Sequence, residues 1–191
     1  MIYIIRHGET DYNVEKRMQG QTDIPLNDEG RNLARQIAEE FKDIKLDAII
    51  SSDLKRASET ADIINSYHNL NVKRDSRLRE FNYGTIEGKL RDELGPEVWE
   101  EYNRNPSAFQ AETMEDIFER VKNFWKEIKS GYKGQNILVV SHGGPIKVSK
   151  YYFDNGDKFD YSKFLSGYMH GFKIKNLEVL KINEFDQDID R

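Results

Sequence analysis

Short apolar runs alternate along this chain with amphipathic segments, and no other feature of the sequence constrains the fold as strongly. Residues 2–5, 46–51 and 137–140 are rich in aliphatic side chains, which is typical of buried strands, and a shorter strand is expected at 71–73. Between the strands, apolar residues recur at helical spacing, most clearly over 114–132. Strands that alternate with helices predict an α/β fold, a three-layer α/β/α sandwich around a mostly parallel central sheet.

Capping residues and periodicity predict where individual elements begin and end. Asn27 is the expected N-cap of the first long helix, and Ser52 or Asp53 is expected to cap the helix after the second strand. Near the C-terminus, apolar and polar residues alternate over 168–174 and 177–185. This alternation predicts two final strands that form a hairpin.

The chain of 191 residues is long enough to bury the core of one domain, and we expect 1–191 to form a single domain. Residues 89–112 interrupt the regular alternation because they contain Pro96 and Pro106. We interpret this segment as an insertion that covers the active site. Its aromatic side chains either line a substrate wall or anchor the insertion to the core.

Two of the predicted strands end in the same way. Residues 6–8 (RHG) follow the first strand, and residues 141–143 (SHG) follow the last buried one. Ligands of open α/β sheets bind beyond the carboxyl ends of the strands. If the two strands are neighbours, His7 and His142 face one another there. Two further histidines lack this context: His68 is expected to lie at the surface, and His170 is expected to be structural.

Residues 5–10 (IRHGET) resemble the signature of the histidine phosphatase superfamily, also called the phosphoglycerate mutase-like family. Other segments are similar to further motifs of this family, in the same order: 19–30 (QGQTDIPLNDEG), 51–61 (SSDLKRASETA), 77–88 (RLREFNYGTIEG) and 141–144 (SHGG). The resemblance covers most of residues 1–145. It implies phosphoryl transfer as the activity.

Transfer of a phosphoryl group, a compact dianion, needs positioning and positive charge. The guanidinium groups of Arg6 and Arg56 match the geometry of phosphate oxygens. The resemblance implies that His7 is the nucleophile and forms a phosphohistidine, and that His142 donates to a phosphoryl oxygen. We expect the two arginines to lower the pKa of His7 below its usual value of about 6.5, so that a neutral imidazole attacks.

The departing alkoxide needs a proton, and the resemblance assigns this acid to Glu80. Glu80 would be protonated when the alcohol leaves and would then act as the base that activates water. Burial beside Phe81 and Tyr83 favours the protonated form. Arg77 and Arg79 favour the carboxylate instead.

Other residues of the matching segments are candidates for substrate binding. Asn13, Gln19 and Gly20 either donate to the substrate or only form hydrogen bonds within their loop. Glu87 is the rival acid, which we interpret as a structural carboxylate. Residues 111–113 (AET) depart from the Gly-Glu-Ser that the family usually has there. The predicted substrate-binding residues are Arg6, His7, Gly8, Asn13, Gln19, Gly20, Arg56, Glu80, Tyr83, His142 and Gly143.

The composition excludes several other chemistries. The chain has no cysteine, which excludes thiol catalysis and thiolate metal sites, and its formal net charge of -5 argues against non-specific nucleic-acid binding. No metal or other cofactor is expected, because Arg6 and Arg56 would repel a cation. No apolar run reaches the ~18 residues that a membrane span needs, and 1–5 is too short for a signal peptide, so a cytoplasmic protein is expected.

The expected partner is a small phosphorylated metabolite, and an exposed sheet edge or the C-terminal hairpin could support a homodimer. The family includes phosphatases and cofactor-dependent phosphoglycerate mutases. A mutase holds a bisphosphorylated ligand and needs a second basic cluster. Residues 89–112 contain Lys89, Arg91 and Arg104, but no Arg-Arg pair, and several acidic residues.

These features favour a metal-independent phosphomonoester hydrolase. It would be similar to the broad-specificity or α-ribazole-phosphate-type phosphatases. The alternatives are a phosphoglycerate mutase and a non-catalytic module that binds a phosphorylated ligand.

Overall fold

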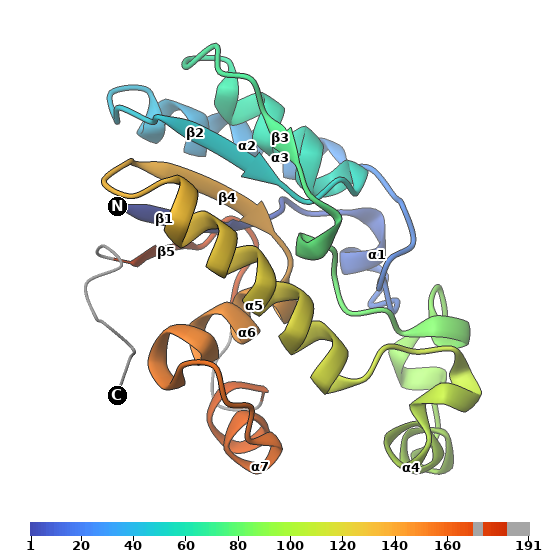
Figure 1. The fold of residues 1–191 in the computed structure, drawn as a ribbon. Helices are drawn as coiled ribbons and strands as arrows, with labels where there is room; N and C mark the ends of the chain where they lie inside the picture. The colour runs from blue at the N-terminus through green and yellow to red at the C-terminus, as the bar shows by residue number, and fades with distance from the viewer. Residues whose placement is uncertain (170–173, 183–191) are drawn as a thin grey trace.

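The computed structural model describes residues 1–169 and 174–182. In these residues, five strands form one sheet in the order β3-β2-β4-β1-β5 (Figure 1). The strands are β1 (Ile2–Arg6), β2 (Ala48–Ser51), β3 (Lys73–Arg74), β4 (Ile137–Ser141) and β5 (Val179–Ile182). Every neighbouring pair is parallel except β1 and β5, which confirms the predicted mostly parallel sheet.

Helices cover both faces of this sheet (Figure 1). α2 (Asp28–Phe41) and α3 (Lys55–Asn65) pack on one face, and α5 (Met114–Gly131) and α6 (Gly143–Asn155) pack on the other. Successive residues of β4 enter the two cores alternately, because side chains alternate across a strand. The predicted three-layer sandwich is therefore confirmed.

The shorter helical elements are α1 (Asp11–Val14), α4 (Pro96–Arg104), α7 (Tyr161–Phe164), a π-helix at Leu165–Met169, and 3-10 helices at Ser76–Leu78, Gly84–Ile86, Arg91–Glu93 and Pro106–Phe109. None of the helices in the described residues combines the length and the apolar character needed to cross a bilayer.

The pairing of β1 with β4 positions the functional site. Arg6 is the register partner of Ser141, and the amide of His7 donates to the carbonyl oxygen of Ser141 at 3.0 Å. Because the two strands are parallel neighbours, they end at the same edge of the sheet. The residues that follow them, His7 and His142, therefore emerge side by side.

The helix boundaries confirm one predicted cap and correct another. The side chain of Asn27 accepts a backbone hydrogen bond at 2.8 Å and caps α2, as predicted. The N-cap of α3 is Leu54, which provides no side-chain hydrogen bond, so the prediction of Ser52 or Asp53 is wrong. Both of those side chains instead contact residues of the site described below.

The second of the two expected C-terminal strands is present as β5, which pairs antiparallel with β1. The expected first strand is wrong at its start, because Tyr168 and Met169 are helical. Phe164 is buried against the aromatic side chains of α6, and this packing outweighs the alternating pattern of the sequence. His170, the other residues of 170–173, and residues 183–191 lie outside the described part of the chain.

The segment interpreted as an insertion forms α4 and two of the 3-10 helices, next to the N-terminal end of α5 (Figure 1). Tyr102 is buried, and its ring packs against those of Trp99 and Phe109, with centroids 5.9 and 5.3 Å away. These aromatic residues therefore anchor the segment to the core. Arg91, near its start, lines the cavity of the site.

Candidate active site

The two histidines at the ends of β1 and β4 face one another, as the sequence predicted. Their ring centroids lie 5.0 Å apart and the rings are tilted by 56°. Both side chains are buried. A pair of buried imidazoles at the carboxyl edge of an α/β sheet lies where this class of fold binds ligands.

The ring of His7 is held in one tautomer. Its Nδ1 atom lies 2.6 Å from the carbonyl oxygen of Gly8, which can only accept a hydrogen bond. Nδ1 therefore carries the proton, and Nε2 keeps a lone pair. Burial lowers the pKa of His7 well below 6.5, and the positive charges of Arg56 and Arg6 lower it further. The expected direction is correct, although burial contributes more than the arginines do.

His142 is oriented by Ser52. Its Nε2 atom lies 2.9 Å from the Ser52 hydroxyl oxygen. That oxygen accepts from the amide of Leu54 at 3.3 Å, so its own proton can be donated to Nε2. Burial lowers the pKa of His142 well below 6.5, so the ring is neutral and carries one proton. If the Ser52 hydroxyl donates to Nε2, that proton sits on Nδ1. Nδ1 is buried and has no partner in the described residues, so it is free to donate to a ligand.

Arg56 is buried and Arg6 is half-buried, and both cations retain unused donors. Arg56 donates to the carbonyl oxygens of Gly20 at 2.7 Å and Thr22 at 2.8 Å, and Arg6 donates to that of Ile174 at 3.0 Å. The Nε atom of each arginine is buried and has no partner within the described residues. Burial lowers the pKa of both guanidinium groups, that of Arg56 to about 10. Buried unpaired donors with positive charge suit an anionic ligand.

Glu80 lies at the N-terminus of α6, beside the histidines. Its Oε1 atom accepts from the amides of Phe81 at 2.8 Å and Gly144 at 2.9 Å. A Cβ atom at position 144 would overlap with this carboxylate, so a glycine is needed for the approach. The carboxylate is thus held in place at the cavity described below.

The two arginines next to Glu80 in sequence are directed elsewhere. Arg79 pairs with Asp53 at 2.5 Å, and Arg77 pairs with Asp75 at 2.6 Å. Neither arginine forms an ion pair with Glu80 in the described residues.

Sequence reasoning missed a pair that holds the Glu80 segment. Arg120 of α5 donates to the carbonyl oxygens of Glu80 at 3.1 Å and Arg77 at 2.6 Å, and it pairs with Glu112 at 2.5 Å. Glu112 also accepts from the amide of Asn82 at 3.3 Å. Of Arg120 and Glu112, the sequence analysis singled out only Glu112, because it lies in residues 111–113, which depart from the family pattern.

The candidate residues in the loops have different contacts: Asn13, Gln19, Gly20 and Glu87. The side-chain oxygens of Asn13 and Gln19 accept from Thr10, at 3.2 Å from its amide and 3.0 Å from its hydroxyl. Gly20 adopts a positive φ of 52°. Glu87 accepts from backbone amides on both sides of the loop, including that of Thr22 at 2.8 Å, which fits the predicted structural role.

A cavity of about 460 Å³ lies next to Arg6 and Gly143, the chain neighbours of His7 and His142. It is lined by Arg6, Glu80, Tyr83, Arg91, Gly143, Gly144, Lys147, Met169, Ile174 and Lys175. Of the predicted substrate-binding residues, Arg6, Glu80, Tyr83 and Gly143 line this cavity. The others are not among its lining residues: His7, Gly8, Asn13, Gln19, Gly20, Arg56 and His142. Its volume is in the usual range for a small-molecule site.

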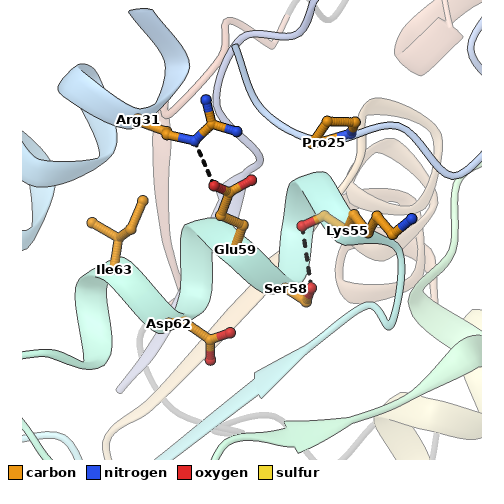
Figure 2. Close-up of a pocket in the computed structure, with 7 residues that line it drawn as sticks. All are labelled: Pro25, Arg31, Lys55, Ser58, Glu59, Asp62 and Ile63. Carbon is orange, nitrogen blue, oxygen red and sulfur yellow. Dashed lines mark hydrogen bonds and ion pairs between the residues drawn. The ribbon is translucent and has the colours of Figure 1, made fainter. Parts of the chain in front are cut away.

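A second hollow of about 550 Å³ lies between α2 and α3 (Figure 2). Each of its charged groups has a partner: Arg31 pairs with Glu59 at 2.6 Å, and Lys55 and Asp62 pair with Asp23 and Arg74 outside the hollow. Glu59 also accepts from the amide of Leu26 at 3.2 Å. No predicted site residue lines this hollow. The contact with Leu26 holds the same loop that contains Gly20 and Thr22, whose carbonyl oxygens accept from Arg56.

Comparisons with known proteins identify the family of this chain. Residues 2–168 match the family described as Histidine phosphatase superfamily (branch 1). The chain therefore belongs to the histidine phosphatase superfamily, as its motifs indicated.

Two relatives and a solved structure represent the family. An uncharacterized phosphatase of Bacillus subtilis, PhoE, is 35% identical, over 82% of this chain and 78% of its own. Phosphoglycerate mutase-like protein 4 of Arabidopsis thaliana is 37% identical, over 76% and 67%. The mycobacterial glucosyl-3-phosphoglycerate phosphatase, solved in complex with VO3, has a TM-score of 0.73 and 28% identity over 85% of this chain and 84% of that one.

Proposed function

We propose that this protein hydrolyses a phosphomonoester of a small metabolite through a phosphohistidine at His7, without a metal ion. The observation that carries the proposal is the arrangement around His7. Its Nε2 atom bears the lone pair, and the unpartnered donors of His142, Arg6 and Arg56 are buried at the same site.

In the first step, the lone pair of His7 Nε2 attacks phosphorus, the P–N bond forms and the bond from phosphorus to the alcohol oxygen breaks. Glu80 gives its proton to that oxygen, so a neutral alcohol leaves. His142 Nδ1–H and the two arginines stabilise the negative charge on the phosphoryl oxygens. They also supply positive charge that a metal ion would otherwise supply.

In the second step, water attacks phosphorus, Glu80 takes a proton from the water, and the P–N bond breaks. Inorganic phosphate leaves, and His7 returns to its neutral form. Hydrolysis rather than mutase activity is supported by the acidic residues of 89–112 and by the phosphatase names among the relatives. The α-ribazole phosphates are one candidate substrate class.

The test is a phosphomonoester panel that includes p-nitrophenyl phosphate, assayed near neutral pH in the presence of EDTA. We expect turnover that EDTA does not change, and a fall of at least about 10³-fold in His7→Ala, in which the nucleophile is missing. Asp154→Asn, far from the histidines on α6, serves as the control. Absence of turnover across the panel would support a non-catalytic binding module, and loss of activity in EDTA would refute metal independence.

The mutase alternative needs a separate assay. We expect that 2,3-bisphosphoglycerate does not start the interconversion of 2- and 3-phosphoglycerate at a rate comparable with hydrolysis. Efficient interconversion would replace the proposed hydrolysis with mutase activity.

A further inference from the structure

Glu87 holds two segments of the chain together with both of its carboxylate oxygens. Oε1 accepts from the amides of Gln21 at 2.9 Å and Tyr83 at 3.0 Å. Oε2 accepts from the amide and from the hydroxyl of Thr22, each at 2.8 Å. Gly20 permits this close approach, because a Cβ atom at position 20 would overlap with the carboxylate. Donors thus occupy the lone-pair positions of the carboxylate, so Glu87 is unsuited to be the acid.

A single peptide unit connects this carboxylate with Arg56. Its N–H group is the amide of Gln21, which donates to Glu87. Its C=O group is the carbonyl of Gly20, which accepts from Nη2 of Arg56 at 2.7 Å. The N–H and C=O groups of a trans peptide point in opposite directions, so the peptide lies between the carboxylate and the guanidinium group. Hydrogen bonds in such a chain polarise and strengthen one another.

Glu87 also supplies negative charge near Arg56. No ion pair in the described residues involves Arg56 or Glu87. Burial lowers the pKa of Arg56 to about 10, and the charges of Glu80, Asp23 and Glu87 oppose this shift. Asp23 pairs with Lys55 at 3.6 Å, and Glu80 is protonated for the first step of the proposed mechanism. Of the three carboxylates, Glu87 is therefore the one whose charge is neither paired nor lost.

We propose that Glu87 is a positioning residue for Arg56, which it orients through the peptide of residues 20 and 21. A direct ion pair would occupy donors of Arg56 that the phosphoryl group needs. The peptide instead holds Nη2, the carbonyl oxygen of Thr22 holds Nη1, and Nε keeps no partner in the described residues. This inference rests on the proposed function, in which Arg56 binds the phosphoryl group.

The test measures the affinity of inorganic phosphate by titration calorimetry, which does not depend on turnover. In Glu87→Gln, one carboxylate oxygen becomes an amide nitrogen that cannot accept from the backbone. We expect the dissociation constant of phosphate to rise at least about 5-fold, because the displaced peptide no longer orients Arg56. Urea unfolding of each variant measures whether it is folded.

Glu59→Gln is the matched control. Glu59 accepts from the amide of Leu26 in the same loop at 3.2 Å, whereas Arg56 binds this loop at Gly20 and Thr22. The control should change the dissociation constant of phosphate less than about twofold.

A double variant separates action through Arg56 from a general effect on the loop. In the Arg56→Met background, Glu87→Gln should change the affinity for phosphate less than about twofold. Weak binding is expected to persist in this background, because Arg6 and His142 remain. An equal loss of affinity with and without Arg56 would overturn the inference.

Kinetics distinguish a positioning residue from an acid. Glu87→Gln should lower kcat/KM by the same factor for glycerol 3-phosphate and p-nitrophenyl phosphate, mainly through KM, because Glu87 gives no proton to the leaving group. A loss confined to glycerol 3-phosphate would make Glu87 the acid and would overturn the inference.

Gly20→Ala perturbs the same contact from the other side, because its Cβ atom would displace the flexible end of the Glu87 side chain. It should weaken phosphate binding as Glu87→Gln does, so the inference is tested even if Glu87→Gln fails to fold. Unchanged phosphate affinity in a folded variant of either kind, or no phosphate binding by the unmodified protein, would overturn the inference. The expected changes in phosphate affinity without turnover of any ester would refute the phosphatase function alone.

Discussion

Replacement of Ser52 by alanine should impair catalysis although Ser52 is outside the proposed catalytic set. The Ser52 hydroxyl is buried and lies 2.9 Å from His142 Nε2. If it donates to Nε2, it fixes the proton of the neutral ring on Nδ1, the nitrogen with no partner in the described residues. In Ser52→Ala this restraint is absent, and the proton can move to Nε2, which leaves a lone pair on the nitrogen that should donate.

The expected loss follows from the energy of one buried hydrogen bond. Leaving a buried polar group unpaired costs about 1–3 kcal/mol, which corresponds to about a 5- to 150-fold change in rate if the whole cost falls on the transition state. The His142 donor matters most when negative charge develops on the phosphoryl oxygens. The loss should therefore appear mainly in kcat, with a smaller change in KM.

The assay is steady-state hydrolysis of p-nitrophenyl phosphate, with urea unfolding of each variant as a measure of stability. Ser52→Thr, which keeps a hydroxyl, should recover most of the activity. Ser58→Ala is the control, because its hydroxyl donates at 3.1 Å to the carbonyl oxygen of Lys55 at the surface of α3 (Figure 2). If folded Ser52→Ala keeps kcat within twofold of the unmodified protein, the assigned role of Ser52 is wrong.

Two further predictions concern Glu80 and the buried histidines. Glu80→Gln should lower kcat/KM far more for glycerol 3-phosphate than for p-nitrophenyl phosphate, since p-nitrophenolate leaves without a proton; equal losses would contradict its role as the acid. The pKa values of His7 and His142 are lowered well below 6.5 in the folded protein, so the unfolded chain binds more protons below about pH 6.5. The free energy of unfolding should therefore fall as pH is lowered through this range, by up to about 1.4 kcal/mol per pH unit for each histidine. Urea unfolding at pH 7 and at pH 5.5 measures this change. Equal stabilities at the two pH values would refute the reasoning.

The sequence predicted the centre of the site well because that centre depends on topology. A histidine that directly follows a buried parallel strand must emerge at the sheet edge. Two such strands that are neighbours bring His7 and His142 together, whatever the loops do.

The residues that hold the site residues in place, and the set of residues that line the cavity, could not be predicted in this way. Ser52 showed the pattern of a helix cap, but its hydroxyl lies beside His142 instead. Arg120 of α5 donates to the carbonyl oxygen of Glu80, 40 positions earlier, and the sequence analysis did not single it out. Lys147 and Lys175 belong to different elements, and only the tertiary structure places them around one cavity. Such contacts depend on long-range packing, which a local pattern does not encode.

The pairing of charges explains how an acidic chain can build a positive site. The chain has 34 Asp and Glu residues against 29 Lys and Arg residues. Arg77 and Arg79, which flank Glu80 in sequence, are paired with carboxylates, so they add little positive charge to the site. Arg6 and Arg56 bind neutral carbonyl groups instead and keep their full charge.

Burial of such unpaired cations is unfavourable, as the lowered pKa of Arg56, about 10, indicates. At neutral pH Arg56 is still protonated, so the unfavourable term persists in the folded protein until an anion binds. A bound phosphate dianion would neutralise the Arg56 cation and so remove the unfavourable free energy of burying it unpaired. Part of the free energy of phosphate binding would therefore come from this neutralisation. Binding of inorganic phosphate should accordingly raise the melting temperature of the protein, and Arg56→Met should reduce this shift more than Arg79→Met, whose guanidinium is already paired.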